Sequence, residues 1–142
     1  MIGRDEILSL VPHGANMCLI DAVIEWDELQ ILCVARNHVR SDHPLRRDGR
    51  LSAIHLIEYG AQAMAVHGAL LARDQNERAR PGMLVSARNF ETTRERLDDL
   101  AGALEIHGRR ELLRGDSMMH SFEARHLGIP IATGRVAVLL QS

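Results

Sequence analysis

The sequence predicts an α+β domain in which an antiparallel sheet wraps around one long central helix. Residues Leu51–Arg73 are apolar on nearly every side, as expected of a helix at the centre of a domain. Two strand-like segments precede this helix and four follow it. The chain has 142 residues, 46% of them apolar, which suits a single domain at 1–142 with a substantial core. An edge strand left open by such a sheet favours pairing with a second copy, so we expect a dimer.

The first half of the chain is predicted to hold one short helix and one hairpin. In order, these elements are a helix at Arg4–Leu10 ended by Pro12 and Gly14, a strand at Met17–Trp26, a turn at Asp27 and Glu28, a strand at Leu29–Asn37, and a loop over 38–50. The loop assignment follows from the lack of any hydrophobic period there.

The second half begins with the central helix, for which Ser52 is a plausible N-cap because its hydroxyl can accept a free amide of the first turn. A charged loop over Asp74–Arg80 should follow. The four predicted strands are Met83–Phe90, Gly102–Glu111, Ser117–His126 and Ile131–Leu140. The sequence HLGIP joins the last two strands and predicts a tight hairpin.

Composition excludes several classes of function. The formal net charge of -2 argues against nucleic acid as a partner, and all 17 basic residues are Arg, which excludes Schiff-base chemistry. Cys18 and Cys33 lie in apolar stretches outside any ligand array, so we expect free buried thiols and no zinc site. No apolar run is long enough to span a bilayer, and the N-terminus has no secretory signal. These observations favour a cytoplasmic protein.

Two polar residues stand out in the central helix. Glu58 and Gln62 lie one turn apart in apolar surroundings, where a carboxylate must be hydrogen-bonded, paired or neutral. His43 lies just upstream, in an irregular segment. A histidine and a sequestered acid suit proton transfer, although Glu58 could equally pair with a buried Arg and His43 could bond to the backbone. His55 could tune the acid or act as the base itself, whereas His67 is more typical of a core or interface position.

Three residue groups resemble the hot-dog fold family of β-hydroxyacyl-ACP dehydratases. PHGANMCLIDAVIEWD (Pro12–Asp27) looks like the family's PHRxPxLLxDRV opening, a His-containing loop covers Asp42–Gly49, and EYGAQAMA (Glu58–Ala65) is similar to the EAxAQ helix motif. HPLRRDGRL before IEYGAQAMAVHGALLA is similar to the small dehydratase-like proteins of aryl-polyene clusters. The family's GHFPG-x-P-x-x-PG run is absent, and His43 lies 15 residues before Glu58, one more than is usual.

The resemblance implies a dimeric hot-dog protein that dehydrates 3-hydroxyacyl chains on an acyl carrier protein, without cofactor or metal. It assigns His43 as base and Glu58 as acid, supplied by different subunits. It also gives the Ala53 amide to the thioester oxygen and Gln62 to the carboxyl or substrate, with His55 beside them. Three arginines near the proposed entrance would meet the pantetheine arm and the carrier protein: Arg46, Arg47 and Arg50.

Two other functions remain open at this point. The altered loop HPLRRDGRLSA is compatible with a catalytically weak subunit that binds acyl-ACP in a heteromer with a related hot-dog chain. A hot-dog thioesterase acting on acyl-ACP or acyl-CoA would need only the acid, and one scaffold hosts several activities.

Overall fold

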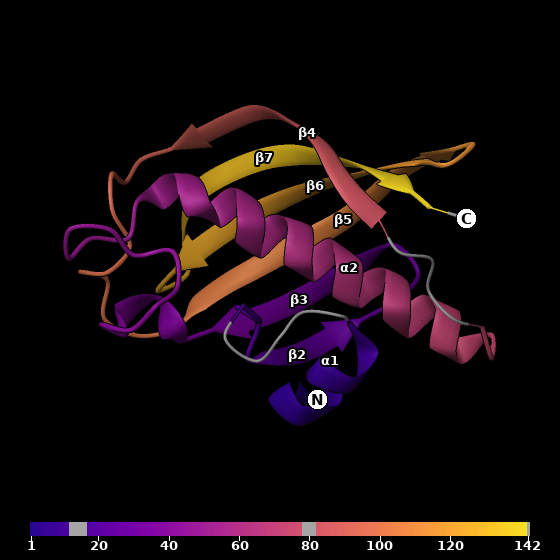
Figure 1. Ribbon diagram of the computed structural model, residues 1–142, viewed down its shortest axis with the longest axis horizontal. Coiled ribbons are helices and arrows are strands. Elements are labelled where there is room, and N and C mark those ends of the chain that lie inside the picture. The colour runs from indigo at the N-terminus through magenta and orange to yellow at the C-terminus, as the bar shows by residue number, and fades with distance from the viewer. Residues whose placement is uncertain (12–16, 78–81, 142) are drawn as a thin grey trace.

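The computed structural model describes residues 1–11, 17–77 and 82–141. In this part of the chain, seven strands form one antiparallel sheet in the order β1-β2-β3-β5-β6-β7-β4, and α2 lies across one of its faces (Figure 1). The elements are β1 (Ile2–Gly3), α1 (Arg4–Leu10), β2 (Ala22–Trp26), β3 (Gln30–Ala35), two 3₁₀ turns (Asn37–Val39 and Ala53–His55), α2 (Leu56–Asp74), β4 (Gly82–Thr92), β5 (Leu104–Arg114), β6 (Ser117–His126) and β7 (Ile129–Leu140). The predicted α+β architecture is confirmed.

The N-terminal segment differs most from expectation. The strand expected over Met17–Trp26 covers only Ala22–Trp26, and the two-residue β1 was not predicted. The reason is that residues before β2 turn toward α2: the Leu19 amide and the Met17 carbonyl bond to the side chain of Gln62. The predicted ending of the first helix at Pro12 and Gly14, and the end of the 74–80 loop, lie outside the described residues.

The central helix begins later than the sequence indicates. Its first turn, Ala53–His55, is 3₁₀, and the α-helix starts at Leu56. The β4–β5 connection holds the residues just before it, since the Leu51 amide donates to Asp98 Oδ1 at 2.8 Å. Ser52 accepts a hydrogen bond from the Ile54 amide at 3.3 Å and so caps the 3₁₀ turn, whereas the N-cap residue of the α-helix itself is His55.

Close packing of α2 on the sheet depends on two glycines around the ring of Phe122. A Cβ atom at Gly60 of α2 would lie 2.5 Å from that ring, and one at Gly134 of β7 would lie 2.8 Å from it. Only glycine therefore allows the helix and the strand to approach Phe122 at these two places.

Two histidines are buried in this core. His67 of α2 is fully buried, as expected of a core position, and its Nε2 lies 2.7 Å from the Asp27 carbonyl oxygen. The His120 ring of β6 lies 5.5 Å from it, centroid to centroid, and neither of its ring nitrogens has a hydrogen-bond partner among the described residues. Burial is the main cause that lowers the pKa of His120 to about 3, so the ring is neutral.

Two other local expectations, the tight turn and the free cysteines, are confirmed. Leu127 and Gly128, with φ of 52° and 78°, form the tight turn predicted between β6 and β7. Cys18 and Cys33 are free and buried. No helix in the described part of the chain is long and apolar enough to cross a membrane.

Candidate active site

His43 is buried, with 6% of its surface exposed, and both of its ring nitrogens are occupied. Its Nδ1 accepts a hydrogen bond from the Leu45 amide at 3.1 Å. Its Nε2 lies 3.1 Å from the Tyr59 hydroxyl, which donates its own proton to Asn37 Oδ1 at 2.6 Å. His43 therefore carries its proton on Nε2 and donates it to Tyr59. Burial first, and then nearby positive groups, lower the pKa of His43 to about 4, which keeps the ring neutral.

The same hydrogen-bond chain continues to α2. Asn37 Nδ2 donates to the Leu19 carbonyl at 2.9 Å, and the Leu19 amide donates to Gln62 Oε1 at 2.7 Å. Gln62 Nε2 in turn donates to Glu58 Oε1 at 3.0 Å. His43 and Glu58 are thus connected through a series of fixed polar groups, but no hydrogen bond or ion pair joins them directly within the chain.

Glu58 is partly exposed, which corrects the expectation of a carboxylate sequestered on every side. The reason is that α2 packs on the sheet by one side only. Ile54, just before the helix, is 51% exposed, and Ala65 is also exposed. Within the described residues, Glu58 makes one hydrogen bond, to Gln62, and no arginine pairs with it. In this part of the chain, Glu58 is therefore not half of a buried ion pair.

The backbone donor expected at Ala53 is engaged within the chain. Its amide donates to the Glu95 carbonyl at 2.9 Å, as part of the short pairing that holds residues 51–53 against 95–97. A thioester oxygen could use this amide only if that bond opened. The role that the resemblance gives to Ala53 stays a prediction.

His55 lies at the start of α2, one turn before Glu58, and is partly exposed. Its ring makes no hydrogen bond within the described part of the chain, and neither ring nitrogen is buried without a partner. Partial burial lowers the pKa of His55, the positive charge of Arg47 lowers it further, and the negative charge of Glu58 opposes both. Arg47, His55 and Glu58 are therefore electrostatic neighbours at one accessible place.

The three predicted arginines differ in availability. Arg46 is turned into its own loop, where it donates to the carbonyls of Gly49 and Val39, both at 3.1 Å. Arg47 and Arg50 bond to each other through their backbones across a two-residue turn, and both are exposed. Only Arg47 and Arg50 present exposed side chains to a partner.

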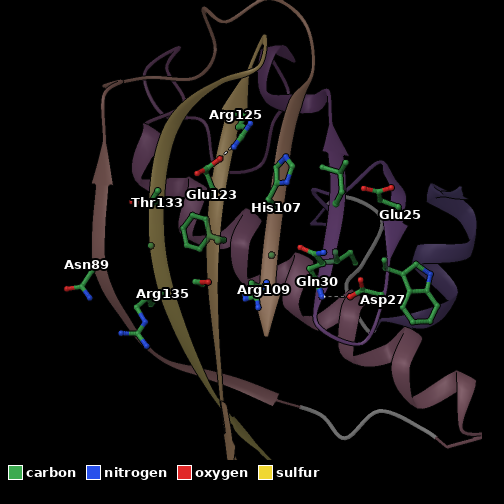
Figure 2. A pocket seen from close by; sticks show the side chains of 17 residues that line it. Glu25, Asp27, Gln30, Asn89, His107, Arg109, Glu123, Arg125, Thr133 and Arg135 are labelled. Carbon is green, nitrogen blue, oxygen red and sulfur yellow. Dashed lines mark hydrogen bonds and ion pairs between the residues drawn. The ribbon is translucent and has the colours of Figure 1, made fainter. Parts of the chain in front are cut away.

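Two hollows of the described surface each lack one or both of His43 and Glu58. A cavity of about 70 Å³ beside His43 is lined also by Leu19 and Asn37, but not by Glu58. A larger hollow of about 810 Å³ lies on the outer face of the sheet, where Figure 2 shows polar side chains such as His107 and Glu123. None of the predicted site residues lines this larger hollow. In the described residues, no three potential metal ligands lie together.

The antiparallel sheet around one long helix, which carries Glu58 and Gln62 one turn apart, is the arrangement of a hot-dog protein. A family model agrees: the ApeP-like model, described as ApeP dehydratase, matches residues 5–141. The chain therefore belongs to the ApeP-like family.

Solved structures share the fold. The ApeI:P dehydratase heterocomplex of Xenorhabdus doucetiae matches with a TM-score of 0.85 and 22% identity, covering 96% of this chain and 91% of that chain. A hypothetical thioesterase with coenzyme A from Streptococcus pneumoniae matches with a TM-score of 0.62 and 11% identity, covering 85% of each chain. A thioesterase from Staphylococcus aureus matches with a TM-score of 0.63 and 12% identity, covering 85% of this chain and 93% of that chain. No curated protein sequence matches this chain.

Tyr59 and Asn37 are the site residues that sequence reasoning missed. Tyr59 follows Glu58 directly and is fully buried, and its hydroxyl connects two loop residues to the helix. A hydroxyl on an otherwise apolar helix was the available signal, because a buried hydroxyl needs partners.

Proposed function

We propose that this chain is a hydro-lyase that removes water from 3-hydroxyacyl chains carried as thioesters on an acyl carrier protein, during polyene or related fatty-acyl synthesis. The observation that supports this most is the Glu58 carboxyl, oriented by Gln62 at 3.0 Å and partly open at the start of α2. Membership of the ApeP-like dehydratase family supports the same reaction.

The reaction needs an acid, a base and a donor to the thioester oxygen. Glu58 is the proposed acid, which protonates the departing hydroxyl. The resemblance gives the base to His43 of another subunit and the oxygen donor to Ala53. Since both groups are engaged within this chain, His55 is the other imidazole to consider.

The carrier protein is proposed to approach over Arg47 and Arg50. Both side chains are exposed next to the start of α2, and guanidinium groups suit the phosphate of the pantetheine arm. The expectation of a cytoplasmic location stays a prediction.

We propose further that β4 pairs with a second copy of this chain. This strand of 11 residues is at the end of the sheet, and three consecutive apolar residues on it are exposed: Met83 by 51%, Leu84 by 41% and Val85 by 54%. An open apolar edge favours strand pairing. Light scattering should give the mass of a dimer for the wild type and of a monomer for Leu84→Arg. A monomeric wild type would argue against this pairing.

A second candidate is a catalytically weak subunit of a heteromer. It is favoured because His43 and the Ala53 amide, two groups that the resemblance makes catalytic, are both hydrogen-bonded within the chain. A Xenorhabdus relative of the same fold was solved as a dehydratase heterocomplex. In that case the chain alone would be inactive, and co-purification with a related hot-dog chain would restore turnover.

The experiment is to incubate the purified chain with 3-hydroxyacyl-ACP, alone and with a related hot-dog chain, and to follow the acyl group by mass spectrometry. We expect the enoyl product, its loss in Glu58→Gln, and no change in Glu25→Gln, a matched variant on the outer face of the sheet. Enoyl formation that persists in Glu58→Gln would contradict the proposed acid. Release of free thiol without enoyl product would identify a thioesterase instead.

A further inference from the structure

We propose that His55 of the same chain, rather than His43, is the base that works with Glu58, and that His43 is a positioning residue. This inference rests on the proposed dehydratase function. It concerns only which imidazole removes the proton from the substrate.

His43 has no ring nitrogen with a free lone pair. Its Nδ1 accepts the Leu45 amide at 3.1 Å, and its Nε2 donates to Tyr59, whose own proton is committed to Asn37. A general base must direct an unoccupied nitrogen at the proton that it removes. His43 could do so only by breaking one of these bonds and leaving a buried polar group without a partner, which is unfavourable.

His55, in contrast, has an unoccupied ring nitrogen that can accept a proton. Its ring is partly exposed and makes no hydrogen bond in the described part of the chain. Partial burial and the charge of Arg47 lower its pKa, so the ring is neutral near neutral pH and keeps a lone pair available.

His55 also lies close to Glu58 along the chain. It is the N-cap residue of α2, with a helical backbone conformation, and it precedes Glu58 by three residues, a spacing that on a helix places Cβ atoms about 5–6 Å apart. An elimination needs a base at one carbon of the substrate and an acid at the hydroxyl of the next carbon. Two side chains on neighbouring helix positions can therefore serve adjacent carbons of one acyl chain.

The step balances without any further reactant. The free nitrogen of His55 takes the α-proton, the C–H electron pair forms the Cα=Cβ double bond, and the β-hydroxyl leaves as water with the proton of the Glu58 carboxyl. The imidazolium and the carboxylate that remain then exchange a proton, which restores both groups. His43 contributes by holding the loop before the helix and, through Tyr59, the hydrogen-bond chain that ends at Gln62.

The test compares His55→Ala with His43→Ala in the chain, or in its complex if the complex is the active form. We expect His55→Ala to lower kcat by about 10²- to 10⁴-fold, with KM little changed and partial recovery on addition of imidazole. We expect His43→Ala, once shown to be folded, to lower kcat by less than about tenfold. His107→Ala, on the outer face of the sheet, is the matched control and should leave kcat unchanged.

A second measurement does not depend on turnover. Nitrogen NMR of the histidine rings should find His43 with its proton on Nε2, and His55 with a pKa below that of a free imidazole. A folded His43→Ala variant that is inactive while His55→Ala keeps wild-type kcat would overturn the inference, as would a His43 ring with its proton on Nδ1. If the wild type forms no enoyl product in any assembly, the proposed dehydratase function fails, and the inference with it.

Discussion

Replacing Tyr59 by Phe removes one oxygen atom from the centre of the hydrogen-bond chain and leaves the packed ring in place. The Tyr59 hydroxyl accepts from His43 Nε2 and donates to Asn37 Oδ1, and the side chain is fully buried. Each lost hydrogen bond costs about 0.5–1.5 kcal/mol, and a buried group left unpaired adds about 1–3 kcal/mol. Two lost hydrogen bonds and one unpaired group together lower the free energy of unfolding by about 2–6 kcal/mol, with no contribution from a cavity.

Urea unfolding, followed by circular dichroism, measures this change. The slope of the free energy of unfolding against urea concentration should be the same in the wild type and the variant. A double-mutant cycle with Asn37→Ala tests the contact itself, and we expect a coupling energy of about 1 kcal/mol between the two positions. A loss below about 0.5 kcal/mol in Tyr59→Phe, or an absence of coupling, would refute the hydrogen-bond chain and remove the reason why His43 is unavailable as a base.

Three further predictions concern the same core. Gln62→Leu leaves the Leu19 amide and the Met17 carbonyl unpaired and should lower the free energy of unfolding by about 2–4 kcal/mol. The control Gln75→Leu, at the exposed end of α2, should change it by less than about 0.5 kcal/mol. Equal urea midpoints for the two variants would contradict this prediction. Gly60→Ala places a Cβ 2.5 Å from the ring of Phe122 and should lower the melting temperature, so an unchanged value would show that the ring can move freely. Burial lowers the pKa of His120 to about 3, so between pH 6.5 and about 3 the unfolded chain binds a proton that the folded chain does not. The contribution of His120 to the free energy of unfolding should therefore be complete above pH 6.5 and decrease on acidification. The dependence of the free energy of unfolding on pH in this range should be smaller in His120→Leu.

The fold was predictable where the sequence has a clear period. The bounds of Arg4–Leu10 and Ser117–His126 agree with the structure residue for residue, because helical spacing and approximate alternation are local signals. The two residues of β1 are too few to show a period. Met17–Asp21 has the composition of a strand, yet it leaves the sheet because Gln62, more than 40 residues away, takes its backbone groups.

The site was predictable in its residue types but not in its connections. Glu58 and Gln62 bond to each other as their spacing on one helix indicates. The occupation of His43 depends on Tyr59 and Asn37, which lie 22 residues apart, and no local pattern reports such a contact. The exposure of Glu58 was also not predictable, because an apolar helix does not reveal which of its sides the sheet leaves uncovered.

The central claim is that Glu58 and an imidazole of this chain remove water from a 3-hydroxyacyl thioester. The most direct measurement is single-turnover dehydration of 3-hydroxyacyl-ACP by the wild type and by Glu58→Gln, with the enoyl product quantified by mass spectrometry. The account predicts rapid enoyl formation by the wild type and at least about a 10²-fold slower reaction in the variant. Equal rates in the two proteins would contradict it.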